Sequence, residues 1–311
     1  MNNIKNIAVY LGSSGHCRST FKQTAAKLGQ LIAERNKTLI YGGMDAGLMG
    51  IVANNTLEGG AEVIGIVPKD LKDSLRIHPH ISKTIMVSSL WERKLEMFHQ
   101  MDAAITLAGG YGTADEMFEV LYWAHLGAHA KPMVLVNTDG YYDDLIAFMD
   151  ALPDLPRKHL IIVDTIEEAF THLDEWKPPQ NEHSSNIHPH FENEILQNTN
   201  EPFIVCKASV KDAYMLTTAL GLKQLQKHER PIGVLNTNGQ FDLFLKWVEH
   251  AKEETFITQN CTQLYSVGST VEELEEKLEH QPKVHIDLNN DKWGKSETPA
   301  QLNINELEPN Q

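Results

Sequence analysis

A glycine-rich segment in the first half of the chain carries residues suited to binding an anion. Residues 107–116 read LAGGYGTADE, in which Gly109, Gly110 and Gly112 follow an apolar run and precede a stretch with helical spacing. Glycines let the backbone of such a turn approach a ligand, and the first amides of the helix are donors at the positive end of its dipole. The segment therefore predicts a phosphate site, to which Thr113 adds a hydroxyl donor.

The same segment permits an interpretation that needs no ligand. Thr113 and Glu116 have the spacing of a capping box, in which the two side chains satisfy amides at the start of the helix. One glycine is enough for a turn, so three glycines favour the phosphate site. The spacing leaves both roles open for Thr113 and Glu116.

Two further turns of small residues each follow a predicted strand. One is GSSG, which begins at Gly12, and the other is YGGMDAGLMG, which begins at Tyr41. Ligands of open α/β sheets bind at the carboxyl ends of the strands. We therefore expect Gly12, Ser13, Gly42 and Gly43 to bind the same ligand as the glycine-rich segment.

A pair of cations, Arg93 and Lys94, lies near the start of the helix expected over residues 88–98. Cations are electrostatically unfavourable at the N-terminus of a helix, so their position indicates a bound anion. The alternative is a solvated basic pair that Glu92 and Glu96 of the same helix balance.

These motifs, in this order, resemble the pattern of the Lonely Guy (LOG) family of cytokinin riboside 5′-monophosphate phosphoribohydrolases, whose bacterial members were long called possible lysine decarboxylases. They stand here as YGGMDAGLMG, WERK, AGGYGTADE and WAHLGAHAKPMVLVNTDGYYDDL, within residues 5–175. Two residues depart from the pattern, because Ala108 replaces a proline and Met44 replaces the third glycine of YGGG. We expect Ala108 to loosen the turn, and Met44 either to narrow the pocket or to change the preferred base.

The resemblance implies hydrolysis of the N-glycosidic bond of a nucleoside 5′-monophosphate, either AMP or a modified adenylate, to free base and ribose 5-phosphate. It implies that Arg93 and Glu116 are catalytic. Departure of the base builds positive charge on the ribose, which a carboxylate can stabilise while it orients the attacking water. The residues of this part of the chain expected to bind substrate are Lys94, Gly109, Gly110, Tyr111, Gly112, Thr113 and Asp115.

No metal or cofactor is expected, and a decarboxylase would need a pyridoxal-phosphate lysine that the sequence does not nominate. The alternative function is a nucleotide-binding or sensing module without turnover. Retention of both Arg93 and Glu116 favours the enzyme.

The elements that must position these residues alternate between strands and helices. Seven short apolar runs read as strands buried on both faces, at residues 6–11, 38–43, 62–68, 83–87, 103–110, 132–137 and 160–164. Helical spacing separates most of them. The pattern predicts an α/β fold, a doubly wound parallel, Rossmann-like sheet, in a nucleotide-binding catalytic domain over residues 1–178.

A shorter unit follows this domain. Residues 131–143 (KPMVLVNTDGYYD) and 230–242 (RPIGVLNTNGQFD) share five of thirteen residues at a constant offset of 99. At that offset the glycines and the carboxylate are lost, since Gly109, Gly110, Gly112 and Glu116 become Ala208, Ser209, Lys211 and Met215. We expect residues 201–280 to be an appended, degenerate and non-catalytic α/β half-repeat.

Two other segments have no apolar period. Residues 179–200 are rich in Asn, Ser, His and Pro and predict a linker, and residues 281–311 predict a loosely ordered tail. Two HPH tripeptides, at 78–80 and 188–190, are expected in loops and not at a metal site.

Composition excludes several classes of protein. Lys and Arg number 27 against 42 Asp and Glu, a net charge of −15 that disfavours binding to nucleic acid polymers. No apolar run has the length of a membrane span, and no signal peptide is recognisable. Cys17, Cys206 and Cys261 are too far apart to indicate a disulfide framework or a zinc site. We expect a cytoplasmic enzyme, and the resemblance implies a homodimer.

Overall fold

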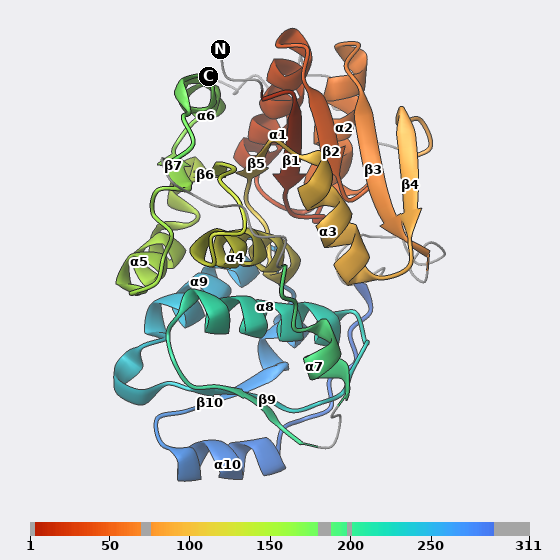
Figure 1. Ribbon diagram of the computed structural model, residues 1–311. Helices are drawn as coiled ribbons and strands as arrows, with labels where there is room; N and C mark the ends of the chain where they lie inside the picture. Colours follow the sequence, from red (N-terminus) through yellow and green to blue (C-terminus); the bar gives the residue numbers. More distant parts are fainter. Residues whose placement is uncertain (1–3, 70–75, 180–187, 198–200, 289–311) are drawn as a thin grey trace, which may run out of the picture.

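The computed structural model describes residues 4–69, 76–179, 188–197 and 201–288, which form two α/β units packed against each other (Figure 1). The first unit is built on a seven-stranded sheet in the order β4-β3-β2-β1-β5-β6-β7, and all its strand pairs are parallel. The predicted doubly wound parallel sheet is confirmed. The chain moves outward from β1 to β4 and then returns to β5 beside β1, so the order switches between β1 and β5.

The strands of the first unit are β1 (Asn6–Tyr10), β2 (Thr38–Tyr41), β3 (Val63–Pro68), β4 (Lys83–Val87), β5 (Ala103–Thr106), β6 (Met133–Val136) and β7 (Leu160–Val163). Its helices are α1 (Ser19–Glu34), α2 (Gly47–Glu58), α3 (Leu90–Gln100), α4 (Tyr111–His125), α5 (Asp143–Ala151) and α6 (Ile166–Glu175). A short 3₁₀ helix, η2 (Thr138–Gly140), follows β6.

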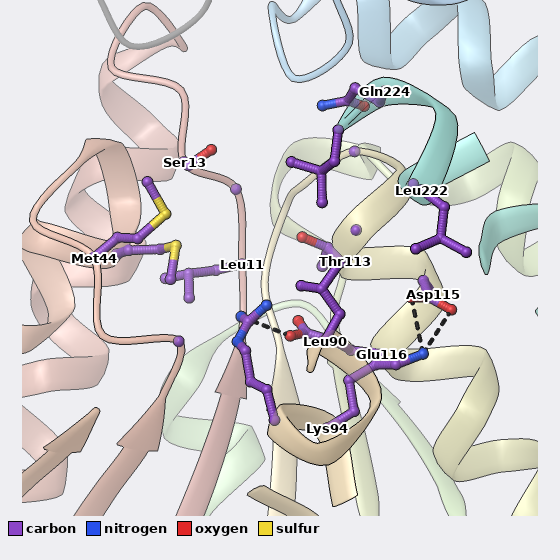
Figure 2. A pocket seen from close by; sticks show the side chains of 18 of the residues that line it. Leu11, Ser13, Met44, Leu90, Lys94, Thr113, Asp115, Glu116, Leu222 and Gln224 are labelled. Carbon is purple, nitrogen blue, oxygen red and sulfur yellow. Dashed lines mark hydrogen bonds and ion pairs between the residues drawn. The ribbon is translucent and has the colours of Figure 1, made fainter. Parts of the chain in front are cut away.

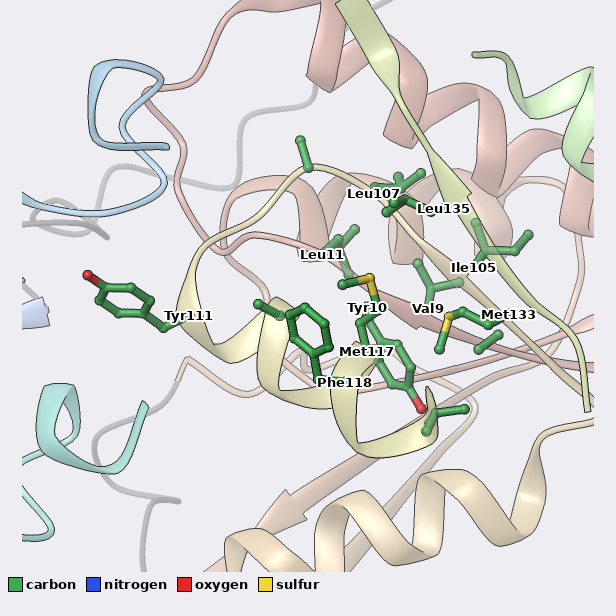
Figure 3. Packing of buried hydrophobic residues seen from close by; sticks show 14 of the residues in the cluster. Val9, Tyr10, Leu11, Ile105, Leu107, Tyr111, Met117, Phe118, Met133 and Leu135 are labelled. Atoms are coloured by element: carbon green, nitrogen blue, oxygen red, sulfur yellow. The ribbon is translucent and has the colours of Figure 1, made fainter. Parts of the chain in front are cut away.

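Burial of the strands follows their place in the sheet. The five inner strands are buried almost throughout, as their uniformly apolar sequences predict. The edge strands β4 and β7 keep exposed residues, so the prediction of burial on both faces is wrong there. Figure 3 shows the centre of the core, where Phe118 and Met117 of α4 pack with Val9 and Ile105 of the sheet.

The second unit has a three-stranded parallel sheet in the order β10-β9-β8. Its strands are β8 (Phe203–Val205), β9 (Ile232–Leu235) and β10 (Tyr265–Gly268). Its helices are α8 (Val210–Gln224), α9 (Asp242–Glu253) and α10 (Val271–Glu279), with 3₁₀ helices η3 (Thr237–Gly239) and η4 (Gln259–Gln263). In Figure 1, α8 lies against α4 and α9 against α5, so the second unit covers the face that these two helices present.

The expected linker and tail are partly packed against the rest of the molecule. Helix α7 (Glu192–Gln197) forms within the linker range, and its Ile195 is buried. The Trp123 indole donates a hydrogen bond to the Pro189 carbonyl oxygen at 2.9 Å. In the tail range Ile286 is buried. The remaining linker and tail residues, 180–187, 198–200 and 289–311, lie outside the described part of the chain.

Within the described ranges, none of the helices combines the length and the apolar sequence needed to cross a membrane. The same residues contain no group of three or more His, Cys, Asp or Glu side chains placed to hold a metal ion. The second HPH tripeptide packs on the first unit, where His190 stacks on Trp91 with ring centroids 4.0 Å apart.

Candidate active site

A pocket opens at the carboxyl ends of β1, β2 and β5, where the strand order switches (Figure 2). This is where an open α/β sheet binds its ligands. Most of the residues that the sequence nominated line it together: Gly12, Ser13, Gly42, Arg93, Lys94, Gly110, Gly112, Thr113, Asp115 and Glu116.

An ion pair lies in this pocket. Arg93 Nη2 donates to Glu116 Oε1 at 2.9 Å, and the Glu116 residue is only 8% exposed. Burial raises the pKa of Glu116 to about 7, although the nearby Arg93 guanidinium opposes the shift. A carboxyl group with a pKa near neutrality can accept and release a proton at physiological pH, which general acid–base catalysis requires.

Gly42 makes room for this ion pair. A Cβ atom at Gly42 would lie 2.2 Å from Arg93 Nη2, so any larger residue would displace the guanidinium. The turn after β2 therefore contributes space for the arginine, in addition to lining the pocket.

The two cations of α3 face α4 and not the acids of their own helix. Glu92 accepts from the Ser88 amide, and Glu96 accepts from the Gln100 side chain. Arg93 pairs with Glu116 as described above. The interpretation of a solvated basic pair balanced by Glu92 and Glu96 is therefore wrong.

Lys94 lines the pocket and is buried between two carboxylates. Its Nζ lies 3.0 Å from Asp115 Oδ2 and 3.2 Å from Glu119 Oε1. Burial opposes the charged form, but the two carboxylates outweigh burial and the pKa of Lys94 is raised. The ammonium group is thus committed to holding α4 acids in place.

The capping box at the start of α4 does not form in the described structure. The helix begins at Tyr111 with Gly110 as its N-cap, so Thr113 and Glu116 both lie inside the helix. The amide end of α4 faces the pocket at Gly110, Gly112 and Thr113. The geometry therefore favours the anion site over the cap.

The three glycines of the LAGGYGTADE segment have different surroundings. A Cβ atom at Gly112 would meet nothing within 4 Å, whereas one at Gly110 would lie 2.6 Å from the Phe256 carbonyl oxygen. A Cβ atom at Gly109 would lie 2.1 Å from Thr113 Oγ1. Gly112 alone of the three leaves space for a ligand, and the other two permit close packing.

Three nominated residues do not line the pocket. Tyr111 is fully buried and points away from it toward the second unit, where its hydroxyl donates to the Cys261 carbonyl oxygen at 3.4 Å (Figure 3). The Thr113 side chain fills the space next to Gly109. Gly43 adopts a φ of +77° and a Cβ atom there would lie 2.5 Å from Val67 Cγ2, so it serves the turn after β2.

Other lining residues were not nominated as binding residues. Leu11, Met44, Met49 and Leu90 form apolar surface from the first unit, and Met44 stands inside the pocket as its departure from the family pattern suggests (Figure 2). From α8 come Thr218, Gly221, Leu222 and Gln224, and Leu225 follows directly after this helix. The sequence carries no local signal for the α8 residues, because only tertiary packing brings this helix to the pocket.

Comparisons with known proteins identify the family. The sequence model described as "Possible lysine decarboxylase" matches residues 49–173 and 215–278. Cytokinin riboside 5′-monophosphate phosphoribohydrolase LOG2 of Arabidopsis thaliana is 35% identical over 205 residues, which are 64% of this chain and 93% of that protein. LOG7 of the same plant is 37% identical over 189 residues, 59% of this chain and 87% of its own.

Among solved structures, the molybdenum cofactor binding protein of Rippkaea orientalis aligns with a TM-score of 0.46 and 22% identity, over 56% of this chain and 98% of its own. The extent of the family match and the identity to full-length relatives establish the membership. The chain belongs to the Lonely Guy family, the possible lysine decarboxylase family of sequence models.

Proposed function

We propose that this protein hydrolyses the N-glycosidic bond of a nucleoside 5′-monophosphate, AMP or a modified adenylate, to free base and ribose 5-phosphate. The observation that carries the proposal is the buried Arg93–Glu116 pair beside the amide end of α4, in one pocket. The relatives named cytokinin riboside 5′-monophosphate phosphoribohydrolases support it.

The pocket divides the substrate between its parts. The 5′-phosphate accepts hydrogen bonds from the start of α4, where Gly112 leaves space and Thr113 adds a hydroxyl. The ribose then lies beside Glu116. The apolar surface that includes Leu11 and Met44 takes the flat face of the base.

The reaction follows from this placement. The bond between C1′ and the base nitrogen breaks, and its electron pair leaves with the base, which takes up a proton. Positive charge develops on the ribose, and the Glu116 carboxylate stabilises it. A water molecule adds to C1′ and gives its proton to Glu116, which releases it to solvent and so balances the proton that the base takes up from solvent. Arg93 holds the carboxylate in position through a charge-assisted hydrogen bond.

Lysine decarboxylation is poorly served by this pocket. A pyridoxal-phosphate enzyme attaches its cofactor to a lysine that must become neutral. Lys94 lines the pocket, but two carboxylates raise its pKa and keep it charged. We therefore favour the phosphoribohydrolase over the decarboxylase.

The test is to incubate the purified protein with AMP, GMP, CMP, UMP and a cytokinin riboside 5′-monophosphate, and to measure free base by chromatography. We expect base release from an adenylate and far less from adenosine, which lacks the phosphate. Tight binding of these nucleotides without base release would instead identify a sensing module.

A further inference from the structure

The same side-chain hydrogen bond forms in equivalent turns of the two units. After β6, Asn137 Nδ2 donates to Asp143 Oδ1 at 2.7 Å, and after β9, Asn236 Nδ2 donates to Asp242 Oδ1 at 2.6 Å. Each pair is separated from the other by the offset of 99 residues found in the sequence. The second unit thus repeats the local geometry of the β6–α5 region.

The helices α4 and α8 make contacts that this offset relates to each other. Thr218 Oγ1 donates to Asp115 Oδ1 at 2.5 Å, and the Tyr214 hydroxyl donates to Glu119 Oε1. At the offset of 99, Tyr214 is the equivalent of Asp115, and Thr218 is the equivalent of Glu119. Each contact is therefore the other contact with the two units exchanged.

The helices α5 and α9 repeat this relation with aromatic rings. Tyr142 stacks with Trp247 at a centroid distance of 6.3 Å, and Phe148 stacks with Phe241 at 5.9 Å. Phe241 is the equivalent of Tyr142, and Trp247 is the equivalent of Phe148. Reciprocal contacts of this kind are the mark of a two-fold interface between like subunits.

From these contacts we infer that the second unit acts as a built-in partner subunit, whose helix α8 completes the substrate pocket of its own chain. The inference rests on the proposed function, since it assigns α8 to the binding of the same nucleotide. It gives the half-repeat, which the sequence predicts to be non-catalytic, a part in binding the substrate. A homodimer of this chain must use another face, because the second unit already covers α4 and α5.

Helix α8 faces the pocket with a small, an apolar and a polar residue. Gly221, Leu222 and Gln224 all line it, and Figure 2 places the latter two across the pocket from Met44. The Gln224 amide can donate and accept hydrogen bonds at the edge of a base. On the same helix, Thr218 donates a hydrogen bond to Asp115, which in turn accepts one from Lys94.

Gly221 offers a test that leaves the helix intact. A Cβ atom at this position would meet nothing within 4 Å. Leucine favours a helix more than glycine does, so Gly221→Leu should fold and place its side chain in the pocket. The matched control is Lys211→Leu, which adds the same side chain at an exposed position of the same helix.

We expect Gly221→Leu to weaken AMP binding by calorimetry, and to lower adenine release, each by at least about tenfold. Its melting temperature should not fall, and Lys211→Leu should match the wild type in binding and release. Wild-type binding and release by a folded Gly221→Leu protein would overturn the inference alone. A wild-type protein that neither binds AMP nor releases adenine would overturn the proposed function, and the inference with it.

Combining two impaired variants tests whether the α8 that lines each pocket belongs to the same chain. Glu116→Gln and Gly221→Leu chains, carrying different tags, are coexpressed and purified through both tags. A pocket completed within one chain predicts no recovery of activity in the mixture. Recovery of about half of wild-type activity would show instead that α8 reaches the pocket of a partner chain, because each mixed dimer would hold one intact site out of two.

Discussion

Two buried glutamates on α4, Glu116 and Glu119, form a matched pair for testing catalysis. Burial raises the pKa of each to about 7, with Arg93 opposing the shift at Glu116 and Lys94 opposing it at Glu119. Glu116 lines the pocket, whereas Glu119 faces Lys94 and Tyr214 behind it. The substitutions Glu116→Gln and Glu119→Gln remove the same charge from similar surroundings.

The two variants should differ in turnover. Loss of an acid–base carboxylate lowers turnover by about 10²–10⁴-fold, so we expect this loss from Glu116→Gln, with AMP affinity within a few-fold of the wild type. Glu119→Gln should lower turnover by less than about tenfold, since Glu119 does not line the pocket and its loss affects only the positions of Lys94 and Tyr214.

The two variants should resemble each other in the pH dependence of stability. A pKa raised from 4.5 to about 7 is equivalent to about 3 kcal/mol. In the wild type, the stability contributed by the Glu116 carboxyl is fully present below pH 4.5. It is lost as the pH rises through about 7. Because glutamine does not titrate, the stability of each variant minus that of the wild type should rise by up to about 3 kcal/mol between about pH 4.5 and about pH 8.

Single-turnover base release measures the effect on turnover. Urea unfolding at about pH 4.5 and about pH 8 measures the effect on stability. Near-normal turnover in Glu116→Gln would end its catalytic assignment. An equal loss in both variants would show that the charge of α4, and not the contact with the substrate, controls the rate.

Three further outcomes follow from the geometry. Gly112→Ala should weaken AMP binding by about tenfold while adenosine binding changes little, because its Cβ enters the part of the pocket that binds the phosphate. Gly110→Ala should instead lower the melting temperature, because its Cβ meets the Phe256 carbonyl oxygen. Thr218→Val should lower the free energy of unfolding by about 1–3 kcal/mol, since Asp115 loses a buried donor, and an unchanged urea midpoint would contradict this. Base release should persist in excess EDTA, and its loss there would refute a reaction that needs no metal.

The sequence was informative where a local pattern has one structural meaning. Inner parallel strands are buried on both faces, so their apolar runs predicted them, and the turns after β1, β2 and β5 could be placed at one edge of the sheet. The edge strands also contain apolar runs, such as LIIV in β7, so the sequence could not show that β4 and β7 lie at the edges and keep exposed residues.

Within the site, the sequence could not predict the direction of a side chain or a contact between residues far apart in the chain. Tyr111 lies among the glycines, but as the first residue of α4 it is turned away from the pocket. The spacing of Thr113 and Glu116 fits both a cap and a site, and only the start of the helix at Tyr111 decides between them. Thr218 reaches Asp115 from 103 residues along the chain, where no periodicity could signal it.

The reciprocal contacts raise the question of whether the second unit holds a second site, and its architecture argues that it does not. The pocket of the first unit needs the turns after β1 and β2, but the described second sheet begins at β8, the equivalent of β5. At the offset of 99, Arg93 corresponds to Glu192, which has the opposite charge, and Glu116 corresponds to Met215.

Restoring one carboxylate therefore cannot restore a site. We expect Met215→Glu to leave the stoichiometry of AMP binding at one per chain and to add no turnover, since Glu192 stands in place of Arg93 and the described second sheet has no equivalents of β1 and β2. Calorimetry on the wild type and this variant measures the stoichiometry directly. Two AMP molecules bound per chain, in either protein, would refute the view that the second unit serves only the pocket of the first.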